Sequence, residues 1–262
     1  MKVVSWNVNG LRSVFNKGFL DYLSSDSPDL LCLQESKVML EQLSEEQISP
    51  PGYSLLLNSA KRKGYSGVAI YLKDSFPKPI EVSTGLGEEL FDSEGRYIVA
   101  KFKDFTLYNI YFPSGTSGDE RQKFKYDFLE HLYEHFSAMP EAERNKSIIC
   151  GDYNICHRAI DIHHPSVAEK RGLSGFLPRE REWMDRFASL GFVDTFRLDK
   201  GDIEKQFSWW SYRANSRQKN LGWRIDYIFA GKALSSKISA TSIHAQTLGS
   251  DHCPVSAEFK VN

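Results

Sequence analysis

Short apolar segments recur along this 262-residue chain, and several end in a carboxylate, amide or imidazole side chain. They are too short for buried helices, so they are typical of strands. In the first segment apolar and polar residues alternate, which predicts a half-buried strand with Ser5 and Asn7 on its polar face. The predicted strands are residues 2–8, 29–33, 67–72, 96–102, 106–112, 147–150, 225–230 and 255–261.

Helical periodicity is confined to three segments. In residues 120–136 large apolar side chains recur at the helical period until Pro140 prevents continuation. A second helix begins at Pro178 and stops at Gly191, and a shorter one lies around residues 19–23. Many strands, few helices and no regular strand–helix–strand alternation predict an α/β chain with two sheets packed face to face and helices outside.

Composition excludes several classes of protein. There is no low-complexity linker or fixed repeat, so we expect a single domain over residues 1–262. The longest apolar run, residues 68–72, is far below the roughly 20 residues that cross a bilayer, and the start of the chain lacks a signal-peptide core, so we expect no membrane partner. The four cysteines lie without CxxC spacing, which favours a reducing cytoplasm: Cys32, Cys150, Cys156 and Cys253.

The charge is nearly balanced, with 33 basic and 34 acidic residues. This excludes a strongly basic protein that coats nucleic acid, so any polyanion must meet a local patch. Residues 207–225 contain no acid and interleave aromatic with basic side chains, which indicates either such a patch or a solvated loop. The basic members are Arg213, Arg217, Lys219 and Arg224.

Polar residues at the strand ends form a second pattern. Any one of them alone would be explained as a turn former or cap. Together they match the side chains that a metal-assisted hydrolytic site needs. The groups are Asn7 with Asn9, Gln34 with Glu35, Asp152 with Asn154, Asp226, and Asp251 with His252.

A hard divalent cation selects carboxylate and amide oxygens, and Glu35, Asp251 and Asn7 are such ligands. Zinc is disfavoured, because His163 and His164 are adjacent and no HExxH or CxxC pattern occurs. Mg²⁺ is therefore the expected ion, with Mn²⁺ as an alternative.

The base that activates a water molecule is either His252 or Asp152. Asp226 is a candidate to accept the imidazole N–H and fix its tautomer. If His252 is protonated, Asp152 must be the base; if it is neutral, it can take the proton itself.

Nine motifs occur in order across almost the whole chain and closely resemble the exonuclease III family, the apurinic/apyrimidinic endonucleases of the endonuclease–exonuclease–phosphatase superfamily. They are SWNVNGLR (residues 5–12), LCLQESK (31–37), KGYSGVAIY (63–71), NIYFPSG (109–115), CGDYNICH (150–157), SGFLPRERE (174–182), WWSYR (209–213), GWRIDY (222–227) and GSDHCP (249–254).

The resemblance implies a four-layered α/β sandwich of the deoxyribonuclease-I-like kind, two β-sheets flanked by helices with the site at one end. It implies Mg²⁺-dependent hydrolysis of double-stranded DNA 5′ to abasic sites in base excision repair, leaving a 3′-hydroxyl. Exonuclease action from the 3′ end and removal of 3′-blocking phosphates are also implied. We expect a monomer in the cytoplasm, associated with the nucleoid if the source is bacterial.

The resemblance also implies roles for single residues. Glu35 matches the main metal ligand, with Asn7 and Asp251 near the ion or its waters. The water-activating acid and the amide beside it match Asp152 and Asn154. The residues that match groups at the scissile phosphate are Asp226, His252 and Tyr111. The expected metal set is Asn7, Glu35, Asp152, Asn154, Asp251 and His252.

Substrate-binding residues follow from the same resemblance and from charge. Trp209, Trp223 and Ile225 match the walls of a pocket for a flipped-out baseless sugar, and each Trp has core packing as its alternative. Asn9 matches a position that holds Asn or Asp in relatives. Expected phosphate contacts, chosen on charge and position, are Arg96, Arg213, Arg217 and Lys219.

Two segments depart from the family pattern, residues 114–122 and 162–175, where relatives often carry contact residues. His163, His164, Lys170 and Arg171 are possible substitutes. Rival functions are a superfamily phosphoesterase acting on RNA, phospholipid or inositol phosphate, and a non-catalytic module that binds damaged DNA.

Overall fold

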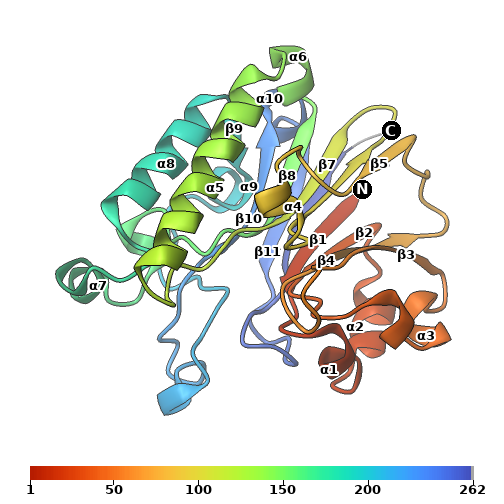
Figure 1. Cartoon of the computed structure of the whole chain (residues 1–262), viewed down its shortest axis with the longest axis horizontal. Coiled ribbons are helices and arrows are strands. Elements are labelled where there is room, and N and C mark those ends of the chain that lie inside the picture. Colours follow the sequence, from red (N-terminus) through yellow and green to blue (C-terminus); the bar gives the residue numbers. More distant parts are fainter. Residues whose placement is uncertain (261–262) are drawn as a thin grey trace.

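Two sheets face each other in the computed structural model, which describes residues 1–260 (Figure 1). The first sheet has the order β11-β12-β1-β2-β4-β3 and the second the order β5-β6-β7-β8-β10-β9. The strands of the first sheet are β1 (Lys2–Asn7), β2 (Leu30–Gln34), β3 (Tyr53–Asn58), β4 (Val68–Lys73), β11 (Ile238–Ile243) and β12 (Val255–Phe259). Those of the second are β5 (Glu81–Ser83), β6 (Tyr97–Lys101), β7 (Thr106–Tyr111), β8 (Ser147–Asp152), β9 (Phe192–Asp194) and β10 (Asp226–Gly231).

Helices cover the outer faces of both sheets, which confirms the predicted four-layered sandwich (Figure 1). The long helices α5 (Asp119–Ala138) and α8 (Pro178–Ser189) cover the second sheet, and α1 (Leu11–Phe15) and α2 (Phe19–Asp26) cover the first. The other helices are α3 (Glu45–Ile48), α4 (Glu89–Asp92), α6 (Glu141–Arg144), α7 (Pro165–Arg171), α9 (Thr195–Lys200) and α10 (Lys232–Ser235). Within residues 1–260, no helix combines the length and apolar character required to span a bilayer.

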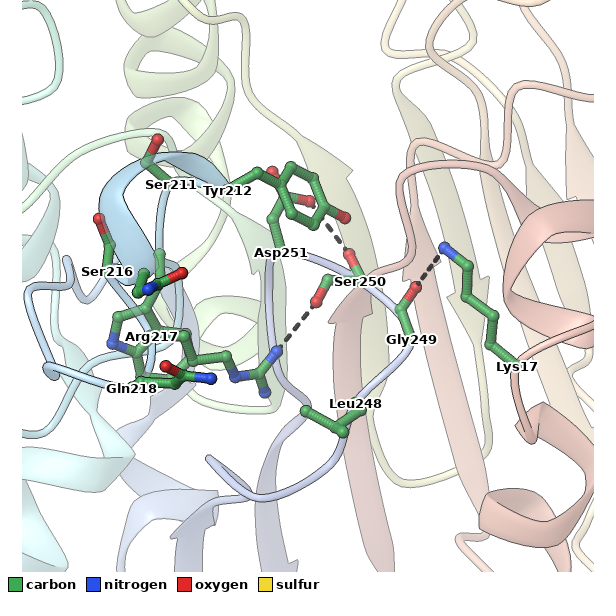
Figure 2. Close-up of a pocket in the computed structure, with 12 residues that line it drawn as sticks. Lys17, Ser211, Tyr212, Ser216, Arg217, Gln218, Leu248, Gly249, Ser250 and Asp251 are labelled. Atoms are coloured by element: carbon green, nitrogen blue, oxygen red, sulfur yellow. Dashed lines mark hydrogen bonds between the residues drawn. The ribbon is translucent and has the colours of Figure 1, made fainter.

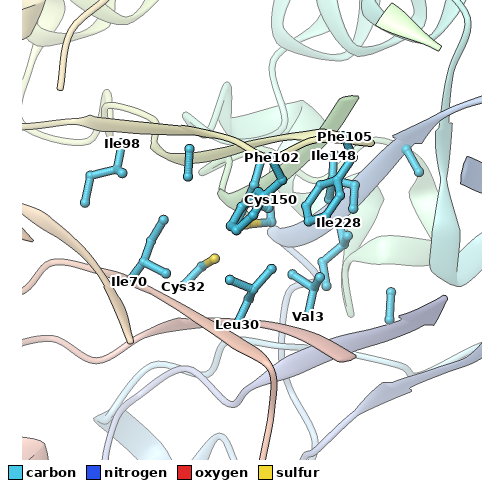
Figure 3. Packing of buried hydrophobic residues seen from close by; sticks show 14 of the residues in the cluster. Val3, Leu30, Cys32, Ile70, Ile98, Phe102, Phe105, Ile148, Cys150 and Ile228 are labelled. Atoms are coloured by element: carbon cyan, nitrogen blue, oxygen red, sulfur yellow. The ribbon is translucent and has the colours of Figure 1, made fainter. Parts of the chain in front are cut away.

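An apolar layer fills the space between the sheets (Figure 3). Val3, Leu30 and Ile70 of the first sheet meet Ile98 and Ile148 of the second, and all five are buried. The four cysteines are buried and unpaired, and a reduced thiol in such a place packs as a small apolar side chain. Because both sheets contribute to one layer, their edges are fixed relative to each other.

The predicted elements are present, with bounds that differ by up to a few residues. The predicted strand 255–261 is β12, and residue 261 lies outside the described residues. We did not predict β3, β5, β9 and β11. β5 and β9 have three residues each, too few for a periodic pattern, and all four are edge strands.

The prediction that β1 is half-buried was wrong. Ser5 and Asn7 have no exposed surface, because their face of the strand points toward the second sheet. A chain of amides crosses the sheets there: Gln34 donates to Ser5 Oγ (3.0 Å) and to Asn109 Oδ1 (2.7 Å). Asn109, on β7, donates to the carbonyls of Leu33 (3.1 Å) and Ala69 (2.8 Å). Polar residues therefore hold the sheets in register near the active edge.

We predict that Asn109→Ala lowers the free energy of unfolding by about 2–4 kcal/mol, because it removes the acceptor of the 2.7 Å hydrogen bond from Gln34 and the donor to the buried carbonyls of Leu33 and Ala69. Urea unfolding followed by circular dichroism measures this. Asn16→Ala, on an exposed side chain, is the matched control and is expected within about 0.5 kcal/mol of wild type. Equal stability of both variants would show that the amide chain does not tie the sheets together.

Candidate active site

Strand ends bring the predicted polar residues to one edge of the two sheets. The parallel pairs β1/β2 and β7/β8 end side by side, and Asp226 at the start of antiparallel β10 lies opposite Asp152. A cavity of about 220 Å³ opens at this edge. Its lining includes Glu35, Tyr111, Asp152, Asn154, Trp209, Trp223, Ile225, Asp251 and His252.

Glu35 follows β2 and has a left-handed backbone (φ 51°). Its Oε1 accepts from Asn7 Nδ2 (2.9 Å) and from the Tyr111 hydroxyl (2.8 Å), while its Oε2 pairs with Lys37 Nζ (2.6 Å). Burial alone would raise the pKa of Glu35, but the Lys37 ammonium, the Asn7 amide and His252 outweigh it and lower the pKa. Glu35 is therefore an ionised carboxylate at neutral pH.

Asp152 ends β8, and a tight turn places Asn154 beside it. The Asn154 backbone N–H donates to Asp152 Oδ1 (2.8 Å), and the Asn154 side-chain amide donates to Asp152 Oδ2 (3.2 Å) and to the Phe112 carbonyl (3.0 Å). The Asn7 amide that contacts Glu35 also donates to Asp152 Oδ2 (2.9 Å). Burial raises the pKa of Asp152 to about 7, with Asp226 adding to the effect and His252 opposing it.

His252 lies in a buried line of polar groups. Its Nδ1 is 2.9 Å from Asp226 Oδ2, and its Nε2 is 3.9 Å from Asp152 Oδ2. Ser208 donates to Asp226 Oδ2 (2.6 Å). Burial favours the neutral imidazole, but the charges of Asp226 and Asp152 outweigh burial and raise the pKa of His252 to about 10. The geometry therefore favours a protonated His252, which is the case in which Asp152 must be the base.

Asp251 lines the cavity, and Asn9 connects it to Lys37. Asn9 Nδ2 (3.0 Å) and Trp209 Nε1 (3.1 Å) donate to the two oxygens of Asp251. Lys37 Nζ donates to Asn9 Oδ1 (2.6 Å), so Lys37 links this pair to Glu35. Burial raises the pKa of Asp251, but His252, Asn9 and Trp209 outweigh it and lower the pKa. Asp251 is thus a second anionic group at this edge.

The donor set suits a hard divalent cation. Carboxylate and amide oxygens dominate the cavity, and no cysteine lines it. One ligand atom each of Asp152, Asp226 and His252 lies within 4.8 Å of the other two, and all three residues are buried. Asp226 Oδ1 has no hydrogen-bond partner among the described residues although it is buried. Because a protonated His252 cannot bind a metal ion, the fit rests on the carboxylates: Glu35, Asp152 and Asp251 line the cavity, and Asp226 lies opposite Asp152.

Trp209, Trp223 and Ile225 form one wall of the cavity. The two indoles meet edge to face, with ring centroids 5.8 Å apart, and their backbones form a bridge. An ion cluster anchors this wall from behind: Arg224 Nε contacts Asp161 Oδ1 (2.7 Å), and Arg224 N donates to the Asp161 carbonyl (2.7 Å). The three predicted pocket residues therefore lie together and next to the acidic residues.

The basic patch that we predicted in residues 207–225 is smaller than its composition suggests. Arg213 and Lys219 are exposed, but Arg224 is buried in the ion cluster. Arg217 is half-buried and donates to the carbonyls of Ser250 (2.9 Å), Ala245 (3.0 Å) and Thr247 (2.5 Å). Figure 2 shows Arg217 beside a second cavity of about 320 Å³, whose other side carries Lys17 and Leu248. Arg217 thus ties its loop to the segment before Asp251.

Arg96 is also turned inward. Its guanidinium is 4.8 Å from the Tyr111 ring centroid, donates to the Tyr111 carbonyl (2.8 Å) and pairs with Glu94. Only 1% of Arg96 is exposed. The structure therefore places this predicted phosphate contact beneath Tyr111. Burial and the Glu35 charge raise the pKa of Tyr111 far above 10, so its phenol stays protonated.

Sequence reasoning missed three residues that support the site. Ser208 orients Asp226, and its position between two aromatic residues gave no signal. Lys125 and Glu180 form a buried ion pair behind Asn154. The sequence does indicate that Lys125 is buried, because it lies one turn from Phe128 and Leu129 on the apolar face of the predicted helix.

Comparison with known proteins identifies the family. The profile of the Endonuclease/Exonuclease/phosphatase family matches residues 4–252. An exodeoxyribonuclease of Bacillus subtilis (strain 168) is 42% identical over 257 residues, which cover 97% of this chain and 98% of that protein. The DNA repair nuclease APEX1 of Danio rerio is 37% identical over 261 residues, covering 97% of this chain and 81% of that protein.

Solved structures agree with this comparison. An AP endonuclease from Archaeoglobus fulgidus superposes with a TM-score of 0.85 at 29% identity, covering 100% of both chains. The 3′ phosphatase NExo from Neisseria, bound to a product DNA hairpin, superposes with a TM-score of 0.87 at 26% identity, again over 100% of both chains. The chain belongs to the Endonuclease/Exonuclease/phosphatase family, and it is a hydrolase with the deoxyribonuclease-I-like fold.

The ion cluster behind the pocket wall gives a pH-dependent prediction. Burial opposes ionisation of Asp161, but Arg224 and Arg197 outweigh it and lower its pKa from 3.8 to about 2. A lowered folded-state pKa contributes stability above the unfolded pKa, and that stability is lost as the pH falls through the folded value. The ionisation of Asp161 therefore contributes about 2 kcal/mol above pH ~4, and the contribution disappears toward pH ~2.

In Asp161→Asn this pH-dependent component is absent. We expect the variant to be about 3–5 kcal/mol less stable than wild type at pH 7, because Arg224 loses a buried partner. Urea unfolding at pH 7, 5, 4 and 3.5 measures the difference, which should shrink only below pH ~4. A difference that is constant over this range would contradict the assignment.

Proposed function

We propose that this enzyme is a Mg²⁺-dependent DNA repair nuclease that hydrolyses the phosphodiester 5′ to abasic sites and leaves a 3′-hydroxyl. Removal of nucleotides and of phosphate from 3′ ends would use the same residues. One observation carries the proposal: the cavity of about 220 Å³ is lined both by the ionisable groups Glu35, Asp152 and His252 and by the apolar wall of Trp209 and Trp223.

The reaction places an anionic diester against an attacking water molecule, so protein groups must supply both positive charge and a base. His252 as an imidazolium and Tyr111 as a neutral phenol donate hydrogen bonds to phosphate oxygens. Asp152 accepts a proton from the attacking water molecule, and Asn154 orients this water molecule. The bond from water to phosphorus forms as the bond to the 3′ oxygen breaks, and that oxygen leaves as an alkoxide, which takes a proton from solvent to become the 3′-hydroxyl.

Glu35, Asn7 and Asp251 would hold the cation. A bound Mg²⁺ would supply positive charge to the phosphate oxygens. Asp152, Asn154 and His252, the other members of the expected metal set, lie on the side of the cavity assigned to water and phosphate. Lys37 holds Asn9 and the Glu35 carboxylate together at hydrogen-bond distance.

The apolar wall supports selection of a baseless sugar. Trp209, Trp223 and Ile225 offer no hydrogen-bond acceptor to a base, and extrusion of a nucleotide is least costly where the base is already missing. Exposed Arg213 and Lys219, on the loop that joins Trp209 to Trp223, are the proposed contacts to the flanking phosphates. Arg96 and Arg217, which donate to protein groups, would act by positioning Tyr111 and the segment before Asp251.

The proposal includes a monomer that binds double-stranded DNA with abasic sites or 3′-blocked ends in the cytoplasm, or at the nucleoid of a bacterium. The names of the Bacillus subtilis and Danio rerio relatives favour DNA over RNA, phospholipid or inositol phosphate. A non-catalytic binding module is disfavoured, because Glu35, Asp152, Asn154, Asp251 and His252 line the cavity, and Asn7, Asn9 and Asp226 form hydrogen bonds with them.

We predict that a duplex with one synthetic abasic analogue is cut on its 5′ side in Mg²⁺, and that EDTA abolishes the cut. Asp152→Asn and His252→Ala should each lower kcat by roughly 10²- to 10⁴-fold, because they remove the base and a charge-assisted donor. Gel separation of labelled strands measures this. Asp185→Asn, outside the cavity, is the matched control and should retain full activity.

The outcomes separate the alternatives. Equal cutting by wild type and both variants would refute the site assignment. Hydrolysis of RNA, phospholipid or inositol phosphate without cutting of the DNA would refute the proposed substrate class. Binding of the abasic duplex without cutting in Mg²⁺ or Mn²⁺ would support the non-catalytic module.

We predict that Trp223→Ala relaxes substrate selection. Removing the indole widens the wall, so the ratio of kcat/KM for the abasic duplex to that for an intact duplex should fall about tenfold or more. Competition between two labelled duplexes in one reaction measures the ratio directly. An unchanged ratio in a folded variant would mean that Trp223 packs the core and does not select the substrate.

A further inference from the structure

Lys125 on α5 and Glu180 on α8 form an ion pair with no exposed surface on either side chain, and Lys125 Nζ is 2.5 Å from Glu180 Oε1. Neither residue is among those that line the active-site cavity. A buried ion pair is often no more stabilising than apolar side chains of the same volume, because both charges lose their hydration. The other hydrogen bonds of Lys125 and Glu180 therefore indicate a role of the pair besides stability.

Lys125 reaches the back of the catalytic turn. Its ammonium donates to the backbone carbonyl of Asn154 (2.8 Å). Asn154 has a left-handed backbone (φ 52°), which is unfavourable for a residue with a side chain unless its surroundings hold it there. With the carbonyl held by Lys125 and the side chain held by Asp152 and Phe112, the Asn154 amide has a fixed direction.

Glu180 holds a second segment. Its Oε2 accepts from the backbone N–H groups of Gly175 (2.7 Å) and Leu177 (2.9 Å). Gly175 (φ 95°) lies so close to the site that a Cβ there would be 2.8 Å from the Trp223 ring and 3.1 Å from the Asn154 carbonyl. The Gly175 carbonyl also accepts from Cys156 N (2.7 Å). The segment thus packs between the catalytic turn and the pocket wall.

We propose that Lys125 and Glu180 are positioning residues: together they fix the Asn154 amide against the Trp223 wall, so that phosphate and sugar are held in one relative arrangement. This rests on the proposed function for the identity of the substrate. Apolar side chains could fill the same volume, but they supply neither the donor for Asn154 nor the acceptor for two backbone N–H groups. The motif SGFLPRERE, which contains Gly175, Leu177 and Glu180, thereby receives a role.

The test is the double variant Lys125→Met/Glu180→Gln, which removes both charges and the donor to Asn154 while keeping similar volumes. We expect kcat on the abasic duplex to fall roughly 10- to 100-fold, because a small displacement of a catalytic amide is costly. KM should change by less than about threefold. Amide hydrogen exchange at Gly175 and Leu177 should become faster.

The matched control is Glu130→Gln/Arg186→Met. It removes another ion pair between α5 and α8 (2.9 Å), one whose side chains are 36% and 46% exposed and which does not contact the site. The control should leave kcat and both exchange rates unchanged. If the pair only joined the two helices, the buried double variant would show the wild-type kcat at temperatures below its unfolding transition, and that result would overturn the proposal.

A second variant covers failure of the double variant to fold. In Glu180→Gln the glutamine carbonyl can take the place of Oε2 and accept from Gly175 N and Leu177 N, while Lys125 loses its carboxylate partner but keeps its hydrogen bond to Asn154. Because a neutral amide oxygen accepts more weakly than a carboxylate, we expect a loss of kcat smaller than that of the double variant and faster exchange at both amides; wild-type values of kcat and of both exchange rates would overturn the proposal. Failure of the wild type on abasic DNA would contradict the proposed function alone, because the exchange rates are measured without substrate.

Discussion

One amide joins the two halves of the active site. Asn7 Nδ2 donates to Glu35 at the end of β2 and to Asp152 at the end of β8, so a single group bridges carboxylates that belong to different sheets. The bridge exists only because β1 turns its polar face toward the second sheet and the buried amides behind it keep the sheets in register. The chemistry therefore depends on how the sheets are packed against each other, and each catalytic residue has a fixed place in that packing.

The same edge separates two electrostatic environments. Glu35 and Asp251 have lowered pKa values, because cationic and amide donors surround them. Asp152 has a raised pKa, because burial is its dominant influence, and His252 is kept cationic by two buried carboxylates. The pKa values of chemically identical carboxylates thus differ according to their neighbours. In this way a site obtains ligands, a base and a cationic donor from few side-chain types.

The fold was predictable, and so was the meeting of the polar strand ends: Asn7 and Asp152 end β1 and β8, Glu35 follows β2, and Asp226 at the start of antiparallel β10 lies opposite Asp152. The directions of the long basic side chains were not. Arg96, Arg217 and Arg224 lie in apolar or basic stretches that fit an exposed surface equally well, and each finds backbone carbonyls or carboxylates that are distant in sequence. The strands β5 and β9 were not predicted, because three residues are too few to show a periodic pattern of apolar side chains.

Backbone strain at the active site explains why so many polar contacts surround it. The backbones of Glu35, Lys37 and Asn154 are left-handed, a conformation that costs of order 1–3 kcal/mol for each such residue and persists only where neighbours enforce it. Ser36 N and Lys37 N donate to the Gly67 and Ser66 carbonyls on one side, and Lys125 holds the other. Because these contacts are made before any substrate arrives, the donors around the phosphate site need no reorganisation during the reaction, and that preorganisation is the main source of electrostatic stabilisation of a transition state.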